Sequence, residues 1–193
     1  MMTAVIPAQN EGQTIGRLLE ELRRLPLNRL IVVLNGSTDN TLTVLGRSPL
    51  RPRLDVLQYE EALGIDVPRA VGARYARRLG ARAVLFIDGD MTGELADCCG
   101  RLLRAVGVYG YDLALTNCYP YMGYRSHVAK QVLDYREQLN RSLGVFTELG
   151  LATPSHGPHC VSARLLNSVS PYSLAIPPLA MAEACLLYTS RCV

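Results

Sequence analysis

Short apolar runs alternate along this chain with segments in which apolar residues recur every three or four positions. The runs predict strands that are buried on both faces, and the recurring positions predict helices that turn one face to a core. Strands are predicted over residues 3–7, 30–34, 54–59, 83–87 and 112–116. Polar or turn-forming residues follow the runs, so strands and helices are expected to alternate.

The helices predicted between these strands are marked by their apolar faces. The first carries Ile15, Leu18, Leu19, Leu22 and Leu25, and the fourth carries Leu95, Cys99, Leu102, Leu103 and Val106. A short second helix bears Leu42 and Leu45. Asp66 is expected to cap the third helix, which has Pro68 in its first turn and runs to Leu79.

The part of the chain after residue 116 has a less regular pattern. One long helix is predicted there from its apolar positions, which are Val128, Val132, Tyr135, Leu139 and Phe146. Residues 147–184 have weaker periodicity and more Pro, Ser and His, which is typical of a lid or an acceptor region. The pattern therefore divides the chain into a regular part over residues 1–116 and a less regular part over 117–184.

Strand–helix alternation with apolar strands predicts an α/β fold in which a mostly parallel sheet is covered by helices on both faces. Ligands of such sheets bind at the carboxyl ends of the strands. Polar clusters follow three of the predicted strands, at residues 9–11, 35–37 and 88–90. Three clusters at one edge of one sheet predict a binding site.

Composition narrows the class of protein. The chain has 193 residues, 49% of them hydrophobic, and a net charge of +3, which fits one globular domain and gives no reason to expect nucleic acid as a partner. No apolar run approaches the ~20 residues of a membrane span, and no signal peptide is recognisable. The six cysteines form no C-x-x-C pair, which favours reduced thiols. A cytoplasmic protein is expected, with peripheral contact to the inner membrane face left open.

The last nine residues differ in character from the rest. Residues 185–193 read CLLYTSRCV, which resembles the translation of two transposon sequencing-adaptor ends joined head to head. This segment is expected to be a non-native tail on a single domain that spans residues 1–184. The natural protein is then expected to continue past Ala184, so the domain is expected to be incomplete at its carboxyl end in this chain.

The sequence Asp88-Gly89-Asp90 follows a predicted strand directly. Two carboxylates one residue apart suit a divalent cation that also touches substrate phosphates, and such an ion neutralises the charge on a departing diphosphate. A divalent cation is therefore expected at this turn. The chain contains neither G-x-G-x-x-G nor G-x-x-x-x-G-K-[ST], which disfavours dinucleotide oxidoreductases and P-loop NTPases.

Three ordered motifs together resemble a known family. They are VIPAQNEG at residues 5–12, VVLNGSTDNT at 32–41 and FIDGD at 86–90. In this order they resemble family 2 glycosyltransferases with the GT-A, Rossmann-like fold, and the similarity is greatest to the glucosyl-3-phosphoglycerate synthase and dolichyl-phosphate-mannose synthase branches. The resemblance covers residues 3–184 and implies sugar transfer from a nucleotide diphosphate, with Mg²⁺ or Mn²⁺, to an acceptor hydroxyl or phosphate.

The resemblance implies a nucleotide-sugar-binding half over residues 1–116 and an incomplete acceptor half over 117–184, and it gives roles to residues of the first half. The positions that match the family's nucleoside-contacting loop are Pro7, Ala8 and Glu11. Asn35 and Ser37 match the loop that reads the base, although many members have Asp where this chain has Leu34-Asn35. An amide still offers a uracil edge both a donor and an acceptor. A UDP-linked sugar is therefore the expected donor, and donors with another base remain an alternative.

Further roles are implied around the diphosphate and the acceptor. Arg69 matches a basic position that faces the diphosphate, Asp88 the ribose-side aspartate and Asp90 the metal ligand. The residues that match the acceptor loop are His156, Gly157 and His159. Glu183 matches an acidic residue that orients or deprotonates the acceptor hydroxyl, a role that suits a desolvated carboxylate.

The predicted function is metal-dependent transfer of a sugar to a small-molecule or lipid-linked acceptor, with a homodimer left open. A non-catalytic sugar-nucleotide-binding relative is one alternative, and turnover in the presence of metal would distinguish it. A nucleotidyltransferase shares the architecture but usually opens with a Gly-rich basic loop, which residues 7–12 lack. An ordinary Rossmann-like binding protein is the third alternative.

Overall fold

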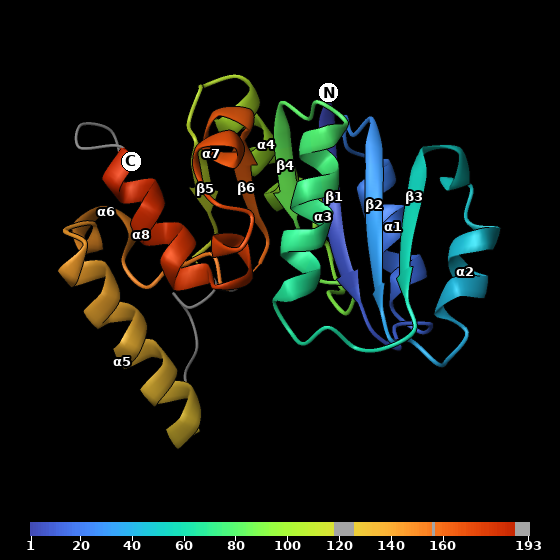
Figure 1. Cartoon of the computed structure of the whole chain (residues 1–193), viewed down its shortest axis with the longest axis horizontal. Helices are drawn as coiled ribbons and strands as arrows, with labels where there is room; N and C mark the ends of the chain where they lie inside the picture. The colour runs from blue at the N-terminus through green and yellow to red at the C-terminus, as the bar shows by residue number, and fades with distance from the viewer. Residues whose placement is uncertain (118–125, 156, 188–193) are drawn as a thin grey trace.

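The computed structural model describes residues 1–117, 126–155 and 157–187 (Figure 1). Its strands are β1 (Met2–Ala8), β2 (Arg29–Asn35), β3 (Leu54–Tyr59), β4 (Ala83–Phe86), β5 (Leu113–Leu115) and β6 (His159–Ser162). Its helices are α1 (Ile15–Arg23), α2 (Thr41–Arg47), α3 (Val67–Arg78), α4 (Ala96–Gly107), α5 (His127–Ser142), α6 (Phe146–Leu149), α7 (Ala163–Ser168) and α8 (Pro177–Leu187). The 3-10 turns are η1 (Arg51–Arg53) and η2 (Ser173–Ala175).

The described strands form one sheet in the order β3-β2-β1-β4-β6-β5. Strands β1 to β4 are parallel neighbours, whereas β6 runs antiparallel to both β4 and β5. The predicted α/β architecture with a mostly parallel sheet is confirmed. Strand β6 was not predicted, because it is four residues long and lies in a segment that was interpreted as a lid or acceptor region.

Helices cover both faces of the sheet, and the sheet separates the hydrophobic core into two layers. Along β1, Ala4 and Ile6 face α1, α2 and α4, whereas Val5 faces α3 and α7. This alternation is the period of two that a strand imposes on its side chains. Because both faces of the sheet are covered, residues of either orientation are apolar, and the parallel strands appear in the sequence as continuous apolar runs. Figure 1 shows α1 and α3 on opposite faces of the sheet.

Helix α3 packs on the sheet at very short range. A Cβ atom added to Gly72 would lie 2.3 Å from Cγ1 of Val5 and 3.3 Å from Cγ2 of Val33. No side chain fits at this position without moving the helix or the strands. The absence of a Cβ at Gly72 therefore sets how closely α3 approaches β1 and β2.

The predicted helix from Val128 to Phe146 is wrong in its extent and in its buried face. Helix α5 ends at Ser142, Gly144 follows with a φ of +72°, and Phe146 begins the separate α6. Val128, Val132 and Tyr135 are 69%, 42% and 70% exposed. The buried positions of α5 are instead Leu133 and Asn140. Helix α5 projects away from the sheet (Figure 1).

Other expectations concern the carboxyl-terminal end and the membrane. Residues 188–193 of the expected non-native tail lie outside the described residues, and residues 185–187 form the end of α8. No helix in the described part of the chain is long and apolar enough to cross a membrane.

Candidate active site

The loops that follow β1 and β2 are joined by hydrogen bonds between their side chains and backbones. Asn10, which has a φ of +58°, accepts on Oδ1 a bond of 2.8 Å from the Thr38 N–H. The Asn10 N–H donates to Oγ of Ser37 at 3.1 Å, and the Gly12 N–H donates to Oδ2 of Asp39 at 2.9 Å. These bonds hold the first two polar clusters side by side at the carboxyl edge of the sheet.

The third polar cluster lies directly against the first. The Gly89 N–H donates to the Pro7 carbonyl at 2.9 Å, and a Cβ added to Gly89 would lie 3.0 Å from that oxygen and from Cβ of Ala8. Thr14 donates from Oγ1 to Oε2 of Glu11 at 2.7 Å, and the same hydroxyl lies 3.2 Å from the Gly89 carbonyl oxygen. The predicted residues Pro7, Ala8 and Glu11 therefore border the Asp-Gly-Asp turn.

Arg69 and Asp88 meet at this edge. The Arg69 side chain is only 9% exposed, and its Nη2 donates to Oδ1 of Asp88 at 2.7 Å. Its Nη1 donates to Oδ1 of Asp66, the residue directly before α3. A buried guanidinium requires such partners, because an unpaired charge in the interior is costly. The site thus holds one cation between two carboxylates.

Asp90 lies at the exposed tip of the same turn, which the Met91 N–H closes by donating to the Asp88 carbonyl at 3.1 Å. Within residues 1–117, 126–155 and 157–187, no group of three or more His, Cys, Asp or Glu side chains is placed to hold a metal ion. The exposed Asp90 carboxylate still fits a hard cation, provided that phosphate oxygens and water complete the oxygen ligands. One protein carboxylate plus a diphosphate is such an arrangement.

Asn35 is buried at the end of β2, with 5% exposure. Its Nδ2 donates to the Gly64 carbonyl at 2.9 Å, and its Oδ1 accepts from the Leu63 N–H at 2.6 Å. Both functional groups of the amide therefore hold the loop between β3 and α3. That Asn35 and Ser37 read the base stays a prediction. The loop contacts of Asn35 could not be recognised in the sequence, since its partners are backbone atoms.

The predicted acceptor residues that the structure describes lie beside residues predicted to bind the donor. A Cβ added to Gly157 would lie 3.7 Å from Oδ2 of Asp88, so this backbone passes close to the carboxylate. His159 is the first residue of β6, is 5% exposed and stacks on Phe86 with ring centroids 4.9 Å apart. Its burial and the nearby Arg69 charge lower the pKa of His159 to about 3. His156 lies outside the described residues.

Glu183 lies on the inner part of α8 and contacts the segment before that helix. Its Oε1 accepts from Oγ of Ser173 at 2.7 Å, and its Oε2 is 3.3 Å from the Ser170 N–H, which donates to it. The carboxylate thus ties α8 to η2. Its predicted role toward the acceptor hydroxyl stays a prediction.

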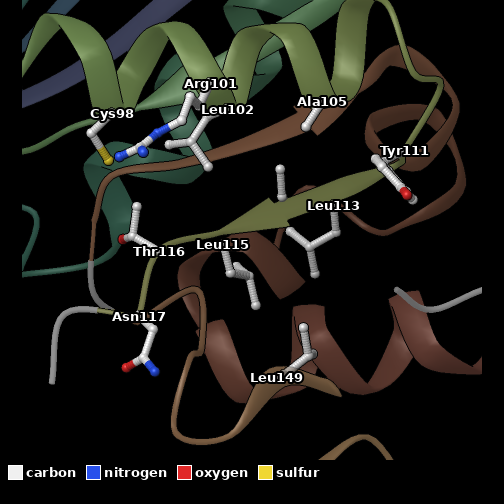
Figure 2. A pocket seen from close by; sticks show the side chains of 11 residues that line it. Cys98, Arg101, Leu102, Ala105, Tyr111, Leu113, Leu115, Thr116, Asn117 and Leu149 are labelled. Carbon is white, nitrogen blue, oxygen red and sulfur yellow. The ribbon is translucent and has the colours of Figure 1, made fainter. Parts of the chain in front are cut away.

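A cavity of about 510 Å³ lies elsewhere, between α4 and the edge strand β5 (Figure 2). Figure 2 shows Arg101 of α4, Leu113 and Leu115 of β5, and Leu149 of α6 around it. None of the predicted site residues lines this cavity. The carboxyl edge of the sheet, with Arg69, Asp88 and Asp90, therefore remains the candidate active site.

Comparison with known proteins agrees with this architecture. The model of the family "Glycosyl transferase family 2" matches residues 3–168. The chain therefore belongs to the family 2 glycosyltransferases, and the resemblance of its motifs is confirmed. A comparison with curated proteins found no match.

Solved structures of glycosyltransferases are similar in fold. A Mycobacterium tuberculosis glucosyl-3-phosphoglycerate synthase, crystallised with UDP, has a TM-score of 0.61 and 24% identity over 98% of this chain and 65% of its own. Mannosyl-3-phosphoglycerate synthase from Rubrobacter xylanophilus has a TM-score of 0.67 and 20% identity over 95% of this chain and 62% of its own. Staphylococcus aureus TarS has a TM-score of 0.57 and 20% identity over 94% and 54%. The chain thus spans less than two thirds of each of these proteins.

Proposed function

We propose that this chain binds a nucleotide-diphosphate sugar, UDP-linked, and takes part in metal-dependent transfer of the sugar to an acceptor hydroxyl or phosphate. The observation that carries the proposal is the meeting of three loops at one edge of the sheet, where Asp88 and Asp90 lie beside the buried Arg69. Membership of family 2 supports sugar transfer as the reaction. A relative of similar fold was crystallised with Mn²⁺, UDP and phosphoglyceric acid, which supports this donor and cofactor.

In this proposal, each residue of the carboxyl edge has its own role in binding the donor. Pro7, Ala8 and Glu11 border the nucleoside, and Asp88 binds the ribose. Arg69 faces the diphosphate with a cation whose position is already fixed, so little reorganisation is needed when charge develops there. Asp90 holds Mg²⁺ or Mn²⁺, which supplies neutralisation of the charge on the departing diphosphate.

The acceptor enters from the side of residues 117–184 in this proposal. The passage of Gly157 beside Asp88 supports that arrangement, since it brings the acceptor half next to the donor carboxylate. His156, Gly157 and His159 line the acceptor loop, and Glu183 orients or deprotonates the attacking hydroxyl. A small molecule or a lipid-linked compound is the acceptor.

Calorimetry with UDP tests the metal-dependent part of the proposal. In Mn²⁺ the wild-type chain is expected to bind UDP more tightly than in EDTA. Asp90→Ala should weaken binding in Mn²⁺ by about tenfold or more, equivalent to about 1.4 kcal/mol, and change little in EDTA. Asp97→Ala, which removes an exposed carboxylate from α4, is the matched control. Equal affinity of wild type and Asp90→Ala in Mn²⁺ would contradict the assignment.

A further inference from the structure

Asp66 occupies the position of a helix cap without acting as one. Asp at the N-cap of a helix ordinarily accepts a hydrogen bond from a backbone N–H of the first turn. Here Asp66 is the N-cap residue of α3, but its side chain makes no cap bond. Its Oδ1 instead accepts from Nη1 of Arg69, one turn further along the helix. The carboxylate is thus committed to the arginine and not to the helix end.

Arg69 is held from two directions. Nη1 points to Asp66 and Nη2 to Asp88, so the planar guanidinium is fixed in rotation as well as in position. With one partner only, a terminal nitrogen of this side chain, which is 9% exposed as a whole, would lose its bond, and the guanidinium could turn about its remaining contact. The orientation that Arg69 presents to a diphosphate therefore depends on Asp66.

The loop that carries Asp66 is itself fixed on the sheet. Asn35 binds the Leu63 N–H and the Gly64 carbonyl through its amide. Gly36 has a φ of +68°, and a Cβ on it would lie 2.8 Å from the Ala62 N atom, so the loop rests directly on the end of β2. The contacts from β2 to the loop place Asp66 at the start of α3, within reach of Arg69.

We propose that Asp66 is a positioning residue of the donor site: it holds the Arg69 guanidinium in the orientation that binds Asp88 and faces the diphosphate. This inference rests on the proposed function, because it gives Arg69 its role toward the donor. Asp66 itself need not touch the donor.

Charge and position make opposite predictions for this residue. Asp66 adds a negative charge near a site for an anionic ligand, so on charge alone its removal should strengthen UDP binding. If it positions Arg69, its removal should weaken UDP binding, because a mobile cation pays an ordering cost each time the ligand binds. The sign of the change therefore separates the two effects.

The experiment compares Asp66→Ala and Asp66→Asn with Glu61→Gln, which removes an exposed charge from the same loop. UDP affinity in Mn²⁺ is measured by calorimetry at low and high salt, since exposed charge effects are screened and direct contacts much less so. Asp66→Ala should bind about fivefold to tenfold more weakly at both salt concentrations. Asp66→Asn, which keeps an acceptor oxygen, should recover part of the loss. Glu61→Gln should bind at least as tightly as wild type.

Side-chain NMR of the arginines, with Arg69→Lys for assignment, gives a readout that needs no ligand. The Arg69 guanidinium protons should be protected from exchange in wild type and Glu61→Gln and exchange faster in Asp66→Ala. Asp66→Ala that matches Glu61→Gln in affinity, or keeps the protected Arg69 signal, overturns the inference. If wild type fails to bind UDP while the Arg69 signal still depends on Asp66, the proposed function is overturned but the hold on Arg69 is not. Thermal unfolding is measured to confirm that each variant is folded. If Asp66→Ala does not fold, the comparison of Asp66→Asn with Glu61→Gln decides the inference.

Discussion

The carboxyl edge of the sheet and the α5 region are held in place in different ways. At the edge, side chains bind the backbones of neighbouring loops, as Asn10 does with Thr38 and Asn35 with Leu63 and Gly64. In α5, apolar side chains such as Tyr135 point outward, and one buried amide, Asn140, ties the helix to the Gly150 and Ala152 carbonyls. The carboxyl edge is thus held by contacts among the described residues, whereas the apolar side chains on the outer face of α5 remain largely exposed.

The largest expected effect contrasts a truncation in the core under the sheet with one on the outer face of α5. Leu22 of α1 is 1% exposed, so Leu22→Ala should lower the free energy of unfolding by about 2–5 kcal/mol through lost burial and a cavity. Val132 of α5 is 42% exposed, so Val132→Ala should change it by less than about 0.5 kcal/mol. Chemical denaturation measures both. A cost above about 1 kcal/mol for Val132→Ala would show that this face of α5 is covered in solution.

A pair of glycine variants tests how closely α3 packs on the sheet. Gly72→Ala places a Cβ 2.3 Å from Val5, and the overpacking should cost about 1–3 kcal/mol even though Ala is the better helix former. Gly46→Ala on α2 meets no atom within 4 Å, so it should stabilise the chain by about 0.5–1 kcal/mol. Thermal unfolding of both variants should give changes of opposite sign. A stabilising Gly72→Ala would mean that α3 can move off the sheet without cost.

A pH dependence is expected at His159, which stacks on Phe86 of β4. The pKa of this imidazole falls from an ordinary 6.5 to about 3 in the folded state, chiefly because it is buried. Between those values the unfolded chain binds a proton that the folded chain does not, so stability is lost as pH falls below about 6.5 and is unaffected above it. Well inside that window the loss approaches about 1.4 kcal/mol per pH unit.

His159→Phe keeps an aromatic ring on Phe86 and removes the titrating group. Its unfolding free energy should therefore fall less steeply than that of wild type between pH 6.5 and the acid limit of folding, and the two curves should run parallel above pH 6.5. His127→Phe changes an exposed imidazole at the start of α5 and serves as the control. Parallel curves for wild type and His159→Phe throughout would contradict the burial of a neutral His159.

The sequence predicted the sheet and the three clusters at its edge because these depend on local patterns. An apolar run followed by Asp88-Gly89-Asp90 places carboxylates at a strand end, and this placement depends only on the local sequence. The buried face of α5 was not predictable in the same way, since spacing shows that a helix has an apolar stripe but not whether anything packs against it. Strand β6 was missed because four residues after a Gly-Pro pair give almost no period to detect.

The partners of individual site residues were harder to predict than their positions. Asp66 was expected to cap α3, and nothing in the sequence ranks a backbone N–H below the guanidinium of Arg69 as its partner. Asn35 was predicted from the resemblance to read the base, and nothing in the sequence indicated that its amide also binds the backbone of Leu63 and Gly64, because backbone atoms are present at every position. The sequence presents several possible hydrogen-bond partners for each of these side chains, and only the folded arrangement determines which one is used.

The place of β6 in the sheet has a consequence for the order in which the chain can be assembled. Strands β1 to β4 occur in succession along the first 86 residues and can pair as each is made. Strand β5 is complete by residue 115, yet its described neighbour is β6 alone, which begins at His159. During synthesis on a ribosome, β5 therefore has no described partner strand until about forty further residues have been made. Strand β6 must then insert between β4 and β5, which have already been synthesised.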